Sequence, residues 1–321
     1  MALYVLRFAH RGRADWGVLR GDRITPIPGE FPTTGEFIRA NSIETLSALS
    51  GPALLQAEVQ LLSPVTANQQ FICQGANYRQ HMIESGMNPD AKTFNMIFTK
   101  ASSCIVPADS NVVRPQHVRF LDYEIELGLV LKREVTSRQR IDDRNLHEYV
   151  AGAVVVNDYS ARDVQIPQMQ FYKGKSFRTF GPVGPNLCLL EASDIAKLRT
   201  LQVTLTVNGS VRQKDSTANL VYGPAETLTE LSGVVDLHVG DLLSTGTPSG
   251  CALRLPSPAK QRVAALLPEA VKWKMFLKLQ AARPEYLKAG DVVKSRIVSA
   301  DGSIDLGMQR NLVVDEALPH A

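Results

Sequence analysis

The sequence predicts a mixed, β-rich α+β protein that carries a small N-terminal unit. Short strand-like runs dominate, among them 200–207 and 291–298, and turn dipeptides such as Asn208-Gly209 and Gly240-Asp241 flank them. The helix–strand alternation of a doubly wound sheet is missing, as is a G-x-G-x-x-G fingerprint, which disfavours a Rossmann dehydrogenase. With 44% hydrophobic and 21% charged residues, a chain of 321 residues has room for about two domains and a sizeable core.

Residues 1–65 form the predicted N-terminal unit, and the sequence Leu62-Ser63-Pro64 marks its end. Strand-like and helix-like runs occur in it at 3–8, 16–19 and 34–49. Arg20-Gly21-Asp22 supplies a turn after the second strand, and Ser42 is placed to cap a helix that begins at Ile43. The second predicted domain is therefore 66–321, with its strands continuing to 242–245 and 304–306.

A helical insertion at about 254–288 interrupts the strand pattern. Prolines break up its first part, and Pro268 fits the first turn of a helix that runs to about Ala282. Val271, Met275, Phe276 and Leu279 would share one face of that helix. The favoured interpretation is a helix packed on the β-core with its lysines in water; a basic helix that binds a membrane or an acidic partner is the alternative.

Composition excludes several classes of protein. The net charge of +3 and the lack of a basic tail argue against nucleic-acid binding, and no run approaches the ~20 apolar residues of a membrane span. The cysteines form no C-x-x-C pair, which favours buried free thiols in a reducing cytoplasm over a zinc or disulfide site. They are Cys73, Cys104, Cys188 and Cys251. The expected location is cytoplasmic.

The most informative segment is a predicted strand at 120–131. Side chains alternate along a strand, so its apolar residues share one face while Asp122, Glu124 and Glu126 line the other. Three like charges about 7 Å apart repel one another unless positive charge lies nearby. One interpretation is a solvated acidic face neutralised by Arg or Lys; the other is a cation site.

A second acidic signal favours the cation site. The apolar run 154–156 ends in Asn157-Asp158, which places a carboxylate where a strand enters a loop. Carboxylates from two strands make a hard, oxygen-only donor set that suits Mg²⁺, Mn²⁺ or Ca²⁺ far better than zinc.

A third signal is His81 followed three residues later by Glu84. On a helix the two side chains face the same way, so Glu84 can orient and stabilise an imidazole that acts as a general base on water. Taken alone, an H-x-x-E pair is more often a surface pair than a catalytic one. It is not a zinc-protease helix, because the second histidine is absent.

The three segments just described belong to a longer series of motifs along the chain. The motifs are Gly75-x-Asn77-Tyr78-x-x-His81-x-x-Glu84, Asp122-Tyr123-Glu124-x-Glu126, Asn157-Asp158-x-Ser160-Ala161-Arg162-Asp163-x-Gln165, Gly174-Lys175-Ser176-Phe177, Gly181-Pro182-x-Gly184-Pro185 and Thr245-Gly246-Thr247-Pro248-x-Gly250. Over about 70–315, this set resembles the fumarylacetoacetate hydrolase (FAH) superfamily, in its bacterial acylpyruvate hydrolase and 2-hydroxyhepta-2,4-diene-1,7-dioate isomerase-like branch.

The resemblance implies a β-roll-like catalytic domain, usually dimeric, behind a small N-terminal domain. It implies one Mg²⁺ or Mn²⁺ per chain on Glu124, Glu126 and Asp158. The roles that it implies for other residues are a catalytic His81–Glu84 dyad on a segment that orders as a lid, a catalytic Lys175, and substrate contacts from Tyr78, Arg162, Gln165 and Thr247. For Thr247, a simple turn residue is an equal alternative.

The function that follows is metal-dependent hydrolysis of a C–C bond in a β-diketo acid of the acylpyruvate or fumarylpyruvate type. Water activated by His81 would attack the distal carbonyl, and the leaving carbanion would be held as an enolate. The same enolate chemistry also serves decarboxylases, isomerases and hydratases of 2-oxo acids such as oxaloacetate or 2-oxohept-3-ene-1,7-dioate. A non-catalytic binding protein is a third, weaker hypothesis, because all of these acidic and dyad positions are occupied.

Overall fold

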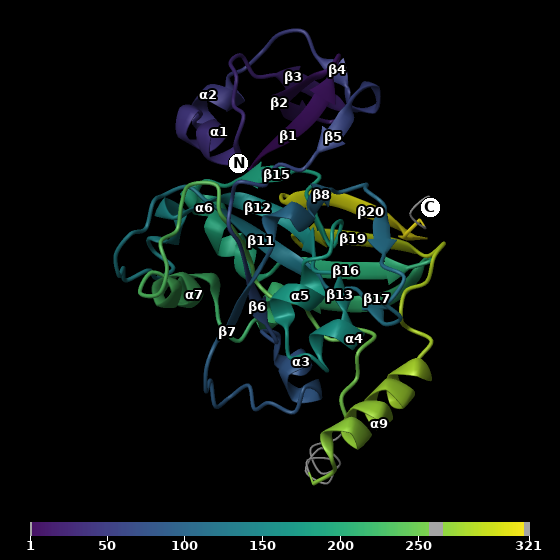
Figure 1. Ribbon diagram of the computed structural model, residues 1–321. Coiled ribbons are helices and arrows are strands. Elements are labelled where there is room, and N and C mark those ends of the chain that lie inside the picture. The colour runs from purple at the N-terminus through teal and green to yellow at the C-terminus, as the bar shows by residue number, and fades with distance from the viewer. Residues whose placement is uncertain (1, 257–265, 318–321) are drawn as a thin grey trace.

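Antiparallel strands and two short helices build the N-terminal unit in this computed structural model, which describes residues 2–256 and 266–317 (Figure 1). The elements are β1 (Leu3–His10), β2 (Arg13–Arg20), β3 (Arg23–Pro26), α1 (Thr34–Ala40), α2 (Ile43–Ser47), β4 (Leu54–Leu55) and β5 (Gln60–Leu62). The predicted cap is confirmed, since the Ser42 hydroxyl accepts the N–H of Thr45 at 3.1 Å. The strands predicted at 3–8 and 16–19 are likewise present; the first is two residues longer than predicted and the second twice as long.

The N-terminal unit is joined to the rest of the chain through its first strand. β1 pairs antiparallel with β15 (Leu187–Leu189), so that Leu3 lies opposite Leu189 and Val5 opposite Leu187. Apolar side chains of β1 and β2 share one buried cluster with those of β12 and β15. The strands of the N-terminal unit therefore continue the large sheet of the rest of the molecule.

The large sheet positions the site. Its main path runs β4-β3-β2-β1-β15-β12-β11-β18-β6-β7, with β5, β8 and β14 beside it. Its remaining members are β6 (Phe71–Gly75), β7 (Met96–Lys100), β8 (Ile105–Pro107), β11 (Ile125–Leu131), β12 (Val150–Asn157), β14 (Gly181–Val183) and β18 (Leu242–Ser244). β11 runs antiparallel to both β12 and β18, and β18 is parallel to β6. The carboxyl ends of β12, β18 and β6 therefore meet the amino end of β11 at one edge.

A second sheet packs against the first. Its order is β17-β16-β19-β20-β9, and its members are β9 (Val112–Arg114), β16 (Gln202–Val207), β17 (Ser210–Ser216), β19 (Val292–Val298) and β20 (Asp305–Asp315). The main hydrophobic cluster combines side chains of β11 and β12 with those of β16 and β19, so it fills the space between the two sheets. The predicted β-rich α+β class is confirmed, and the strand expected at 304–306 extends to Asp315.

The strand predicted at 120–131 is divided in two. β10 (Leu121–Asp122) pairs with β13 (Ser160–Ala161), while β11 begins at Ile125 and belongs to the large sheet. The predicted separation of faces holds, because Leu121, Tyr123 and Ile125 lie in the main core. The break at Tyr123 and Glu124 turns the acidic side chains toward the edge where the strand ends meet.

Short helices connect these strands. They are α3 (Arg79–Glu84), α4 (Arg162–Gln165), α5 (Phe171–Lys175), α6 (Ala192–Ile195) and α7 (Pro224–Leu231), followed by α9 (Glu269–Ala281). Within the described residues, no helix is both long and apolar enough to cross a membrane.

Helix α9 confirms the predicted helix but corrects its orientation. It extends away from the body of the molecule (Figure 1), and Val271, Met275 and Leu279 are 43–54% exposed. Of the predicted face Phe276 is buried, together with Gln280, and Leu277 packs against the main core. The helix therefore contacts the β-core as predicted, but most of its apolar face is left exposed. Gln280 holds the buried face inward through hydrogen bonds to the Arg254 carbonyl before the helix and the Tyr286 hydroxyl after it. Residues 257–265 of the predicted insertion, and the last four of the predicted domain 66–321, lie outside the described residues.

Candidate active site

The sheet edge where four strand ends meet gathers buried ionisable side chains. Glu124 and Glu126 stand at the amino end of β11, and Asp158 directly follows β12. The backbone locks this corner, because the Asp158 N–H donates to the Glu124 carbonyl at 2.8 Å and the Asn157 side chain accepts the Glu124 N–H at 3.0 Å. One carboxylate oxygen from each of Glu124, Glu126 and Asp158 lies within 4.8 Å of the others. All three are buried, so a solvated acidic face is excluded.

Two buried lysines neutralise part of this charge. The Lys175 ammonium, at the end of α5, lies 2.5 Å from Glu124 Oε2 and 2.5 Å from Asp158 Oδ2. Lys100, at the end of β7, lies 2.5 Å from Asp158 Oδ1 and also donates to the Phe180 carbonyl at 2.8 Å. Burial alone would lower the pKa of Lys175, but Asp158 and Glu124 together raise it above its usual range. Both lysines are therefore charged at neutral pH.

Arg162, at the start of α4, joins three partners. Its guanidinium donates to Asp122 Oδ2 at 2.9 Å, to Glu124 Oε1 at 2.5 Å and to Gln165 Oε1 at 2.7 Å. Asp122 in turn accepts the N–H groups of Ala252 and Leu253 at 2.7 and 2.9 Å, which ties the loop after β18 to the site. Such a network fixes the planar guanidinium at the floor of the site.

Glu126 is held by neutral donors. Its Oε2 accepts the Ser244 hydroxyl at 2.6 Å and the Gly246 N–H at 3.0 Å. Gly246 has φ +89°, and a Cβ there would lie 2.8 Å from the Asn77 side chain, so the turn that aims this N–H requires glycine. Burial, Asp158 and Glu124 raise the pKa of Glu126 to about 8.

The buried cluster is short of positive charge. Among the described residues, four buried carboxylates here face three buried cations, which leaves one negative charge uncompensated. These residues are Asp122, Glu124, Glu126 and Asp158 against Lys100, Arg162 and Lys175. The raised pKa of Glu126 is the electrostatic result, because a proton there restores neutrality. An oxygen-only set that is short of positive charge fits a hard divalent cation.

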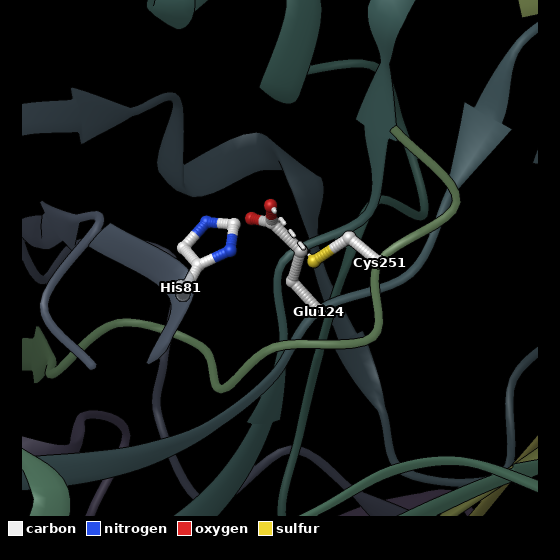
Figure 2. Close-up of side chains that lie close together, drawn as sticks. All are labelled: His81, Glu124 and Cys251. Carbon is white, nitrogen blue, oxygen red and sulfur yellow. Dashed lines mark hydrogen bonds between the residues drawn. The ribbon is translucent and has the colours of Figure 1, made fainter. Parts of the chain in front are cut away.

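His81 approaches the cluster from α3. Its ring lies beside the Glu124 carboxylate (Figure 2). Burial lowers the pKa of His81, and Arg162 lowers it further, although Glu124 and Glu84 act in the opposite direction. The imidazole is therefore neutral at pH 7 and able to accept a proton. Glu84 is half-buried one turn further along the helix and accepts from Gln80 at 3.4 Å; no hydrogen bond joins Glu84 to His81 within the described part of the chain.

A cavity of about 240 Å³ opens onto these groups. The predicted site residues that line it are His81, Glu124, Glu126, Arg162, Gln165, Lys175 and Thr247. Met87 and Phe98 form part of its wall, and so do Leu253 and Leu255, which lead into the insertion. A larger surface hollow of about 630 Å³ lies by α7, away from the carboxylate cluster.

Two predicted substrate contacts need separate description. The Thr247 hydroxyl donates to the Ile125 carbonyl at 3.0 Å and accepts from Gln213 Nε2 at 2.8 Å, so its proton is already used. Tyr78 is fully buried outside the cavity lining, and its hydroxyl has no hydrogen-bond partner among the residues that the structure describes. Substrate binding by either residue stays a prediction.

Sequence reasoning missed several members of this site. Lys100 ends an ordinary apolar strand, and Gln213 lies in a polar strand far from every motif, so neither carries a local signal. The sequence predicts buried free thiols, and all four cysteines, Cys251 among them, are free and buried. Cys251 Sγ nevertheless lies 3.8 Å from Glu124 Oε1. The proximity arises from the loop after β18, which only the fold brings to β11.

Comparison with known proteins places the chain in a family. Residues 70–314 match the family model for the C-terminal region of fumarylacetoacetate (FAA) hydrolase, and residues 5–64 match a model described as Rv2993c-like, N-terminal. The chain therefore belongs to the fumarylacetoacetate hydrolase family.

Its relatives carry out more than one reaction. The chain is 32% identical over 314 residues to 2,4-didehydro-3-deoxy-L-rhamnonate hydrolase of a Sphingomonas species, covering 96% of this chain and 94% of the relative. It is 37% identical over 197 residues to the oxaloacetate tautomerase YisK of Bacillus subtilis, covering 60% of this chain and 64% of the relative. The crystal structure of a fumarylacetoacetate hydrolase from Exiguobacterium antarcticum superposes with a TM-score of 0.75 at 28% identity, covering 98% of this chain and all of the other. With YisK, the similarity spans less than two thirds of the relative's length.

Proposed function

We propose that this protein is a divalent-cation-dependent hydrolase that cleaves a C–C bond in a β-diketo acid of the acylpyruvate type. The observation that carries the proposal is the neutral His81 ring beside a buried carboxylate set that is short of positive charge, with His81, Glu124 and Glu126 lining one cavity. A general base and a cation site within one small cavity are what water attack on a chelating substrate requires.

Glu124, Glu126 and Asp158 would hold Mg²⁺ or Mn²⁺, which polarises a carbonyl oxygen as a Lewis acid when bound. His81 accepts the proton of the attacking water, and Glu84 favours the imidazolium that forms, because its charge raises the pKa of His81. The ring can then return that proton to the carbanion carbon of the leaving group, which gives a carboxylic acid and pyruvate or a related keto acid.

The oxygen that becomes an enolate needs a donor in a dry site. The Lys175 ammonium has three N–H groups and uses two of them on Glu124 and Asp158, so one is left for a substrate oxygen in the cavity. Arg162 and Gln165 line the same wall and offer positive charge and an amide to the substrate's oxygens. Donors fixed before the reaction stabilise developing charge better than water does.

A second candidate is an enolate-forming enzyme that adds no water, such as a tautomerase or decarboxylase acting on oxaloacetate. The similarity to an oxaloacetate tautomerase supports it. So does the lack of a hydrogen bond between His81 and Glu84 among the described residues, since an unsupported base is less suited to activating water. The cation set and Lys175 would serve this reaction equally well.

The two candidates are separated by their products. The chain is incubated with Mg²⁺ or Mn²⁺ and offered acetylpyruvate, fumarylpyruvate and oxaloacetate separately. Pyruvate together with acetate or fumarate supports the hydrolase. Interconversion of enol and keto oxaloacetate, or release of pyruvate and CO₂ from oxaloacetate alone, replaces it with the second candidate.

A further inference from the structure

Cys251 completes a second set of donor atoms at the edge of the carboxylate cluster. Figure 2 shows its sulfur and the His81 ring on either side of the Glu124 carboxylate. One donor atom from each of His81, Glu124 and Cys251 lies within 4.8 Å of the other two. The three come from separate places in the chain, namely α3, the amino end of β11 and the loop after β18. Nothing in the proposed reaction uses the thiol.

One of the distances between these atoms is close to that of a tetrahedral site. Zinc binds thiolate sulfur at about 2.3 Å and histidine nitrogen or carboxylate oxygen at about 2.0–2.2 Å, which places neighbouring donors about 3.4–3.6 Å apart. The distance between Cys251 Sγ and Glu124 Oε1 is 3.8 Å, within a few tenths of an ångström of that value. The Cys251–Glu124 pair is therefore nearly in place, and His81, within 4.8 Å of both, has to move closer by side-chain rotation to complete the set.

The His81, Glu124 and Cys251 donors favour a different cation from the one that the carboxylate set favours. Nitrogen and sulfur ligands favour Zn²⁺ and similar thiophilic ions, whereas Glu124, Glu126 and Asp158 offer oxygen only. Both sets contain Glu124, and a divalent ion in one set neutralises the negative charge that would hold a second ion in the other. A fourth ligand can enter from the cavity, because His81 and Glu124 both line it.

We propose that His81, Glu124 and Cys251 form an alternative site for Zn²⁺ or another thiophilic divalent cation, whose occupation excludes the hard cation and blocks the His81 base. Binding at this site stands independently of the reaction that the enzyme catalyses. The inhibition rests on the proposed function, since it requires His81 to act as a base.

Charge and access both allow binding. Burial raises the pKa of the Cys251 thiol, so the ion must displace a proton, which leaves through the cavity to solvent. The ion also competes with the bond from Arg162 to Glu124 Oε1, but Arg162 keeps its partners Asp122 and Gln165. With the thiolate counted, the buried cluster carries two uncompensated negative charges among the described residues, and one divalent cation balances them.

Binding is tested with Co²⁺ as a spectroscopic probe on the full chain. A thiolate ligand gives a charge-transfer band in the near ultraviolet, which Zn²⁺ should abolish by displacement. The wild type and the control Cys188→Ser, a buried thiol on β15, should both show the band, and Cys251→Ser should lack it. Absence of the band in the wild type, or its persistence in Cys251→Ser, overturns the proposal.

A second variant guards against a folding defect in Cys251→Ser. His81→Ala leaves the thiol in place and should weaken Zn²⁺, measured by competition with a chromogenic chelator, by about 10-fold or more, since even loss of an outer-shell partner costs 10–100-fold in metal affinity. Unchanged affinity in His81→Ala would contradict the proposed ligand set.

The last comparison is the effect of Zn²⁺ on turnover. In the presence of Mg²⁺, Zn²⁺ should inhibit the wild type and Cys188→Ser, and should inhibit Cys251→Ser much less. If no substrate is hydrolysed at all, the proposed function fails while the Co²⁺ band still decides the site. If hydrolysis occurs and Zn²⁺ inhibits all three proteins equally, the inhibitory role of this site is rejected.

Discussion

At the scale of single residues, the site is governed by buried charges that compensate one another incompletely. Asp158 is the central anion, because both Lys100 and Lys175 contact it and none of the three side chains is more than 3% exposed. Removing one partner of a buried ion pair leaves charge without compensation, which is far more costly than losing a surface pair. Metal binding and stability are therefore coupled at this residue.

We expect Asp158→Asn to abolish metal-dependent turnover and also to lower the free energy of unfolding by about 3–5 kcal/mol, because two buried ammonium groups lose an anion. Chemical denaturation in metal-free buffer measures the change. Asp90→Asn is the matched control, since Asp90 pairs with Arg79 on the exposed surface and its loss should change stability little. Equal stability of Asp158→Asn and the wild type would contradict the assigned ion pairs.

Glu126 makes the metal-free protein sensitive to pH. Its pKa is raised from 4.5 to about 8 in the folded chain, so between these values the native state binds more protons than the unfolded state. Stability should therefore fall as pH rises from about 5 to 8. Melting temperatures across this range should show the fall in the wild type and a weaker one in Glu126→Gln, whose amide oxygen can still accept from Ser244 and Gly246. A wild-type stability that rises over the same range would exclude the buried, protonated Glu126.

At the scale of elements, α9 shows how one polar residue can orient a helix. Gln280 donates to the Arg254 carbonyl at 3.0 Å and accepts the Tyr286 hydroxyl at 2.7 Å, while Phe276 packs beside it. The apolar residues that the helical periodicity places on one face are left largely exposed. A pattern of hydrophobic residues alone could not reveal this, because the inward face is held by hydrogen bonds from Gln280 to residues outside the helix.

We expect Gln280→Ala to loosen the docking of α9 by about 1–3 kcal/mol, because it leaves the buried Tyr286 hydroxyl and the part-buried Arg254 carbonyl without this partner. Amide hydrogen exchange over 269–281 should become faster in this variant. Met275→Ser on the 48% exposed position should leave the exchange unchanged. Faster exchange in Met275→Ser than in Gln280→Ala would place the docking face on the other side of the helix.

At the scale of the whole molecule, the sequence predicted the β-rich class, most strand positions and the FAH family from ordered motifs. It also predicted that Glu124, Glu126 and Asp158 supply one carboxylate set, but not the sheet order that brings their strand ends to one edge. It could not predict Lys100, Gln213 or Cys251 at the site, because sheet order brings them there and no local pattern marks them. The homodimer and the cytoplasmic location stay predictions.

The continuity of the sheet leads to a prediction about the two proposed domains, 1–65 and 66–321. Because β1 pairs with β15 and fills a cluster shared with β12, a chain starting at residue 66 would expose that strand edge and its apolar neighbours. We expect this fragment to aggregate or to melt well below the full chain in thermal denaturation. A fragment that melts like the full chain would show that the N-terminal unit is only an appendage.

In the proposed reaction, His81 activates water for C–C bond cleavage. The most direct test follows acetylpyruvate by NMR in the presence of Mg²⁺ or Mn²⁺, using the wild type, His81→Ala and the control His10→Ala, whose residue lies on β1. We predict pyruvate and acetate from the wild type and from His10→Ala, and loss of both products in His81→Ala while Mn²⁺ still binds. Hydrolysis by His81→Ala at the wild-type rate, or no acetate from any of the three proteins, would contradict this mechanism.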